Sequence, residues 1–78
     1  MYEGMDAVRI GSTIKALREE KGETAEALSD ALNISNSAIA MYETGKRIPR
    51  DEIKIRIAEH FHVPVESIFF PNKQHETC

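Results

Sequence analysis

The sequence predicts a small all-α protein built as a single domain. The chain has 78 residues, which is room for one compact domain. Its apolar residues recur at intervals of three and four, the spacing of one face of a helix, and no segment alternates as a β-strand would. Gly, Asn and Pro separate these segments. We therefore expect five short helices within residues 8–70, between a flexible leader (1–7) and a flexible tail (71–78).

The first two expected helices are separated by a glycine. Ile10, Ile14 and Leu17 form one apolar stripe, as in an amphipathic helix. Gly22 ends this helix, because Gly readily takes the left-handed conformation just past a helix end. Thr24 is a good N-cap for the second helix. The residues expected on its inward face are Leu28, Ala31 and Leu32.

A third helix follows closely. Asn33 comes directly after the second helix, and Asn tolerates left-handed geometry better than most other residues. Ser35 is placed to cap the third helix, in which we expect Ile39 and Tyr42 to be buried. Gly45 ends it.

An Ile-Pro link leads to the last two helices. Asp51 and Glu52 then place negative charge in a first turn, where the helix dipole favours it. The expected inner face of this fourth helix consists of Ile53, Ile57, Ala58 and Phe61. A Val-Pro dipeptide breaks the helix. The apolar residues that suggest a short fifth helix are Val65, Ile68 and Phe69.

Cysteine and histidine placement excludes several classes of protein. Cys78 is the sole cysteine, so no intramolecular disulfide can form, and a free thiol without a signal peptide fits the cytoplasm. No apolar run reaches the roughly 20 residues of a membrane span. His60 and His62 would point to different faces of a helix, and no spacing resembles a zinc motif. With no catalytic arrangement and no Gly-rich phosphate loop, we expect no metal, no cofactor and no enzymatic activity.

The distribution of charged residues indicates whether the protein could bind a nucleic acid. The net charge of −3 argues mildly against such binding. However, Lys46, Arg47 and Arg50 form a short basic cluster, and the local field at a docking face attracts phosphate more than the net charge does. From composition alone, a solvated loop remains the favoured explanation of this cluster.

Residues 24–46 meet the requirements of two helices that cross steeply at a short turn. Ser29 supplies a small residue where the helices touch, and Asn33 supplies a turn residue that accepts positive φ. The apolar residues at offsets suited to packing across the corner are Leu28, Leu32, Ile34, Ile39 and Tyr42. The pattern predicts a helix-turn-helix over roughly residues 24–44.

Here the sequence resembles the Cro/C1-type (xenobiotic-response-element-like) helix-turn-helix family of phage repressors and small bacterial regulators. The resemblance covers roughly residues 10–70. It includes I-x-x-L-R-E-E-K-G before the bihelical unit, Y-E-T-G-K-R-I-P after it, and I-A-E-H-F-H-V-P-V-E-S-I-F near the end. It implies a five-helix lambda-repressor-like domain whose third helix enters the major groove of double-stranded DNA.

The resemblance also implies which residues contact DNA. The candidate base readers are Asn36, Ser37 and Met41; the Asn36 amide suits adenine and Met41 suits a thymine methyl. The alternative is that they are merely exposed helix residues. The resemblance changes the favoured interpretation of the basic cluster to phosphate binding. The candidate phosphate contacts are Thr24, Ser35, Lys46, Arg47 and Arg50.

Three further features follow from the family pattern. Arg18 and Glu43 match an ion pair that ties the first helix to the third in some members, and we interpret it as structural. Ala25 stands where members commonly carry a Gln that anchors the second helix to phosphate. Glu23 replaces what is usually Leu. The last two departures are expected to affect DNA affinity more than the fold.

The sequence thus predicts a sequence-specific transcriptional regulator, a repressor, that binds a palindromic operator as a homodimer. The fifth helix carries more apolar surface than a short helix can bury on its own core. We therefore expect the dimer interface to consist of Val65, Ile68, Phe69 and Phe70. The alternative is that all four cap the core. The rival function is a protein-interaction module, antitoxin-like or an adaptor, on the same fold. Glu23, Ala25 and the acidic net charge support this rival, and salt-dependent DNA binding would distinguish the two.

Overall fold

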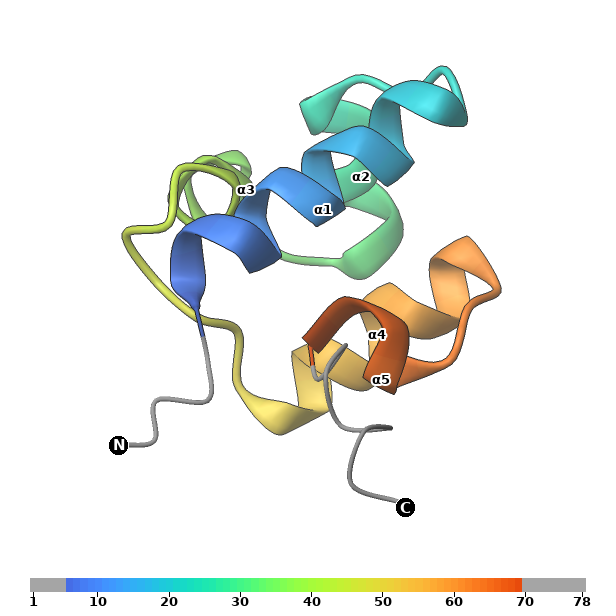
Figure 1. Cartoon of the computed structure of the whole chain (residues 1–78). Coiled ribbons are helices and arrows are strands. Elements are labelled where there is room, and N and C mark those ends of the chain that lie inside the picture. The colour runs from blue at the N-terminus through green and yellow to red at the C-terminus, as the bar shows by residue number, and fades with distance from the viewer. Residues whose placement is uncertain (1–5, 70–78) are drawn as a thin grey trace, which may run out of the picture.

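The computed structural model describes residues 6–69, and all regular structure in that range is helical (Figure 1). The helices are α1 (Ala7–Glu20), α2 (Ala25–Leu32), α3 (Asn36–Glu43), α4 (Asp51–Phe61) and α5 (Val65–Phe69). This confirms the predicted all-α, five-helix architecture. In Figure 1, α1, α2 and α3 occupy the upper part of the molecule, and α4 and α5 pack together below them.

Side-chain caps define where the first three helices begin. The Asp6 carboxylate accepts a hydrogen bond from the Arg9 N–H (3.2 Å), so α1 starts at Ala7, slightly earlier than the expected boundary. Thr24 and Ser35 cap α2 and α3 in the same way, each at 3.0 Å. Both caps were predicted, and each satisfies a backbone donor that the helix itself leaves without a partner.

Left-handed residues follow the ends of the first four helices. Gly22, Asn33 and Gly45 have φ of 76°, 58° and 82°, as their residue types predicted. His62 ends α4 with φ 58°. The sequence assigned that break to the following Val-Pro dipeptide and did not identify His62 as the turning residue.

One apolar core lies among the helices. Its buried members are Ile10, Ile14, Leu28, Leu32, Ile39, Tyr42, Ile57, Ala58, Ile68 and Phe69. The prediction for Ala31 is wrong, because this side chain is exposed. The face of α2 that packs inward carries Ser29 instead, only 3% exposed. Ala31 lies roughly 100° around the helix from the centre of that face.

The expected dimer interface needs a correction. Ile68 and Phe69 are each 1% exposed, because α5 packs against both α4 and α1 and directs these side chains into the core. They leave no surface for a second subunit, so the prediction is wrong for this pair. Val65 is half-buried against the same core. Phe70 lies outside the described residues.

Candidate nucleic-acid interface

The corner between α2 and α3 is fixed by its backbone and by one small side chain. The N–H groups of Asn33 and Ile34 donate to the carbonyls of Asp30 (3.1 Å) and Ser29 (3.0 Å), which satisfies the end of α2. The Ser29 hydroxyl donates to the Glu26 carbonyl at 2.8 Å. A buried serine therefore sits at the helix contact without an unsatisfied polar atom, as the helix-turn-helix pattern requires.

The three candidate base readers share one face of α3. Asn36 and Ser37 are exposed, Met41 is half-buried, and Ala40 lies exposed between them. Residues at these offsets span roughly 140° of a helix surface. The opposite face, with Ile39 and Tyr42, is buried. The structure thus brings together the residues that the resemblance singled out for base contact.

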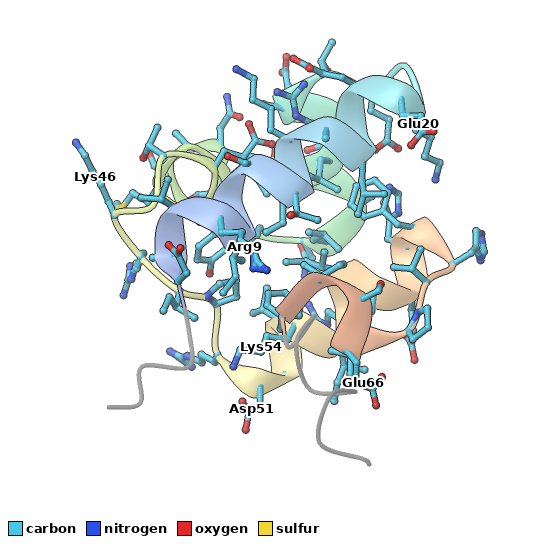
Figure 2. All side chains as sticks on the ribbon, viewed as in Figure 1. Arg9, Glu20, Lys46, Asp51, Lys54 and Glu66 are labelled. Carbon is cyan, nitrogen blue, oxygen red and sulfur yellow. The ribbon has the colours of Figure 1, made fainter. Side chains whose placement is uncertain are left out.

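The basic linker after α3 lies next to this face. The N–H groups of Lys46 and Arg47 both donate to the Met41 carbonyl, at 2.9 and 3.3 Å. Lys46, Arg47 and Arg50 are exposed, and none of them forms a salt bridge within residues 6–69. In Figure 2, Lys46 extends away from the linker into solvent. Three positive charges therefore remain available beside α3.

The remaining candidate phosphate contacts, Thr24 and Ser35, are the N-caps of α2 and α3. Their hydroxyl oxygens already accept the backbone hydrogen bonds described above. A hydroxyl that accepts one bond still carries a hydrogen to donate. Both residues are exposed, so each can donate to an anion without losing its role as a cap.

The predicted ion pair supports α3 from behind. The Arg18 guanidinium donates to both oxygens of Glu43, from Nε at 2.8 Å and from Nη2 at 3.0 Å. Its Nη1 donates to the Glu23 carbonyl at 2.9 Å. The hydrogen bond to Glu43 raises the pKa of Arg18, and burial opposes this in part. Arg18 therefore stays charged at neutral pH, and its hydrogen bonds to Glu43 join α1 to the end of α3.

A glycine that sequence reasoning missed also determines where α3 lies. A Cβ added at Gly11 would come within 2.4 Å of the Tyr42 carbonyl oxygen and 2.6 Å of the Glu43 carbonyl oxygen. Gly11 lies in the interior of α1, where glycine costs about 1 kcal/mol relative to alanine. That unfavourable placement was the available signal of a close backbone approach.

A second missed feature fastens α2 to α4. His60 Nε2 lies 2.9 and 3.0 Å from the two Glu23 carboxylate oxygens, just before α2 begins. Lys21 Nζ lies 3.8 Å from the same carboxylate. At the other end of α2, Arg56 Nη1 donates to the Leu32 carbonyl at 2.9 Å. Glu23 is thus a structural contact whose charge has partners, rather than an isolated negative charge.

The described part of the chain contains neither a membrane-spanning helix nor a cluster of metal-binding side chains. No helix within residues 6–69 is long and apolar enough to cross a membrane. In the same range, no three His, Cys, Asp or Glu side chains come together as a metal site would require.

Comparisons with known proteins identify the family. Residues 14–68, more than half of the chain, match the family described as Helix-turn-helix. A protein of Pyrococcus horikoshii, described as an HTH-type transcriptional regulatory protein, is 39% identical over 59 residues. These residues make up 74% of this chain, and the match spans 19% of that relative's length.

Solved structures agree on the fold. The restriction-modification controller protein C.AhdI from Aeromonas hydrophila has a TM-score of 0.77 at 23% identity, covering 82% of this chain and 97% of that one. The P22 c2 repressor, solved with a synthetic operator, has a TM-score of 0.75 at 21% identity, covering 78% and 92%. These likenesses confirm the five-helix lambda-repressor-like architecture. The chain belongs to the Cro/C1-type helix-turn-helix family of DNA-binding transcriptional regulators.

Proposed function

We propose that this chain is a sequence-specific DNA-binding transcriptional regulator whose helix α3 lies in the major groove of double-stranded DNA. One observation carries the proposal: the exposed face of α3 presents Asn36, Ser37 and Met41 together, with a basic linker beside it. Side chains on one face of a helix can reach base edges. The cations beside it are suited to the phosphates that border the groove.

The rigidity of the support strengthens this proposal. The C-terminal end of α3 lies against the α1 backbone at Gly11 and is held by the Arg18–Glu43 pair. A recognition helix held in this way presents its side chains in one orientation, which limits the ordering cost of binding. Repression is the simpler output, because occupancy of an operator by itself blocks access to the DNA.

The proposal includes a homodimer on a palindromic operator, with half-sites about one helical turn apart. Two-fold symmetry would present two α3 helices to successive major grooves. Of the predicted interface residues that the structure describes, only Val65 retains partly exposed surface. The proposed location is the cytoplasm, where a bacterial or phage regulator meets its operator.

The experiment begins with selection of bound sequences from a random DNA pool. The selected duplex and an unrelated duplex of equal length are then titrated by fluorescence anisotropy over a salt series. We expect a palindromic selected sequence, preferred over the unrelated duplex by at least about 10³-fold, and a Kd that rises steeply with salt. Sedimentation velocity of the protein–DNA complex gives the number of chains bound, for which we expect two.

A protein-interaction module on the same fold is the second candidate. Ala25 favours it, because this residue is half-buried against the core and offers no side chain to anchor α2 to a phosphate. A protein that binds only other proteins would show no salt-dependent binding to either duplex. That result would replace the DNA-binding proposal with this one.

A further inference from the structure

Three charged or titratable side chains meet where the end of α1, the turn before α2 and the end of α4 come together. His60 Nε2 lies 2.9 and 3.0 Å from the two carboxylate oxygens of Glu23, and Lys21 Nζ lies 3.8 Å from the same carboxylate. The Lys21 ammonium also donates to the His60 carbonyl at 3.2 Å. The side chains of Glu23 and His60 are each only 18% exposed. We call these three residues the Lys21–Glu23–His60 cluster.

The geometry determines where the His60 ring carries its protons. An ionised carboxylate offers only acceptors, so the Nε2 that faces Glu23 must carry a hydrogen whether the ring is neutral or charged. The other ring nitrogen, Nδ1, forms no hydrogen bond within residues 6–69. Because every fully buried side-chain nitrogen or oxygen in this range has a partner, Nδ1 reaches solvent. A change of pH therefore adds or removes a proton at Nδ1, while the hydrogen bond to Glu23 stays.

Protonation of His60 changes the net charge of the cluster. When His60 is neutral, the charges of Lys21 and Glu23 cancel. When His60 is protonated, the cluster carries one positive charge. Histidine is the side chain whose charge changes between about pH 5 and 8, so the cluster gains a positive charge as the pH falls through this range.

The other charged groups around His60 do not offset this change. Those on the neighbouring elements are exposed, and none forms a hydrogen bond or ion pair with His60 within residues 6–69; they are Glu20 on α1, Glu26 and Asp30 on α2, Arg56 and Glu59 on α4, and Glu66 on α5. Arg18 donates to the Glu23 carbonyl at 2.9 Å, but its charge is paired with Glu43. Glu23 is thus the charged group that His60 contacts.

The cluster lies beside a proposed phosphate contact. Glu23 directly precedes Thr24, the exposed N-cap of α2 whose hydroxyl is a candidate phosphate ligand. Adjacent Cα atoms are about 3.8 Å apart, and exposed charges act on one another over about 10 Å at about 0.1 M salt. A phosphate bound at Thr24 would therefore respond to the charge of the cluster. A neutral His60 leaves the repulsion from Glu23 opposed by Lys21 alone, whereas a protonated His60 adds attraction.

We propose that His60 links DNA binding to protonation, because its positive charge offsets that of Glu23 beside the N-terminus of α2. The inference rests on the proposed DNA binding and deepens it. His60 acts through the charge beside α2 and not by touching DNA, so it is a positioning residue. Affinity is highest when His60 is protonated and falls as the pH rises through the range in which histidine titrates. Because such coupling is reciprocal, DNA binding near neutral pH must take up protons.

The test measures Kd by fluorescence anisotropy between about pH 6 and 8 at constant ionic strength, with the selected operator and an unrelated duplex. For the parent we expect Kd to rise with pH by roughly two- to fivefold per bound chain. The rise should be alike on both duplexes, because phosphates and not bases are affected. In His60→Gln, which keeps a donor for Glu23, the pH dependence should disappear and Kd should stay near the parent's high-pH value.

The matched control is His62→Asn. His62 is exposed and has a left-handed backbone, which Asn tolerates. It lies on α4's last turn without contacting Glu23, so this variant should keep the pH dependence of the parent. Glu23→Gln should bind more tightly than the parent at about pH 8, because it removes the negative charge that a neutral His60 no longer offsets.

Two further measurements separate a charge effect from a structural one. Isothermal titration calorimetry in buffers of different ionisation enthalpy should show proton uptake when the parent binds the operator near neutral pH, and almost none for His60→Gln. The pH dependence of Kd should also shrink as salt is raised, because salt screens the cluster from the DNA. A purely structural role of His60 would not respond to salt in this way.

Failure of this inference is distinguishable from failure of the proposed function. A parent that binds neither duplex at any pH would refute the proposed function. A parent that binds DNA with a Kd independent of pH, or a pH dependence that His60→Gln retains, would refute the link to His60 alone. A pH dependence that persists undiminished at high salt, with each variant fully folded by circular dichroism, would overturn the explanation by charge.

Discussion

Replacing Gly11 by alanine tests whether a close backbone contact determines the position of α3. Alanine is the better helix former by about 1 kcal/mol, so the exchange would stabilise a helix at an open position. At Gly11 the new Cβ would come within 2.4 Å of the Tyr42 carbonyl oxygen and 2.6 Å of that of Glu43. Both are backbone atoms, so no side chain can rotate away, and the two helices must separate.

The expected cost follows from these distances. Real Cβ contacts essentially never fall below 3.0 Å, so α1 and α3 must move apart by more than half an ångström. Overpacking of this kind costs up to about 3 kcal/mol, which leaves a net loss of about 2 kcal/mol after the gain in helix propensity. For a domain of this size the unfolding midpoint should fall by roughly 10 °C.

The assay is urea and thermal unfolding followed by far-ultraviolet circular dichroism. The matched control is Ala16→Gly at an exposed position of the same helix, which should cost only the propensity difference of about 1 kcal/mol. Gly11→Ala should also weaken operator binding under conditions where the variant is fully folded, because α3 moves. An unfolding free energy equal to or above that of the parent would refute the reasoning about Gly11.

The remaining predictions concern single contacts. Asn36→Ala should cost roughly 1–3 kcal/mol on the selected operator and little on unrelated DNA; equal losses in anisotropy titrations on both would show that this residue does not read bases. Lys46→Ala should weaken binding to every sequence and lower the salt slope by about one, and an unchanged slope would contradict the phosphate contact. Glu43→Gln should destabilise the fold by about 2–3 kcal/mol in urea unfolding, because Arg18 then keeps a mostly buried charge without its partner; no loss of stability would show the pair to be dispensable. Because the pKa of Arg18 is raised, the contribution of this pair should persist through neutral pH and fall only in strongly alkaline solution, as the pH passes that pKa; unfolding over a pH series checks this. His60→Gln, which keeps a donor, should retain more thermal stability than His60→Ala, and equal midpoints would exclude a role for the hydrogen bond to Glu23.

The sequence predicted local structure best where one residue type satisfies one backbone requirement. Thr24 and Ser35 cap their helices, and Asn33 turns left-handed, because few residues meet those demands. The resemblance also supplied the pairing of Arg18 with Glu43. All of these features depend on short motifs that are visible along the chain.

The features that the sequence did not reveal depend on how helices distant in the chain meet. The burial of Phe69 depends on α1 lying over α5, and the contact between His60 and Glu23 joins residues far apart in sequence. Hydrophobic periodicity reports which face of a helix is apolar, but not which neighbour covers it.

The fastening of α2 to α4 has a consequence for modularity. Two side chains one turn apart on α4, Arg56 and His60, hold the residues at either end of α2. The orientation of the two-helix unit formed by α2 and α3 therefore depends in part on α4, which follows it in the chain. Grafting residues 24–44 alone onto another scaffold should transfer the proposed base-reading side chains of α3, but not the angle at which α4 holds the two-helix unit. An exchange of binding specificity between relatives should succeed when only the exposed residues of α3 are moved and the surrounding helices stay in place.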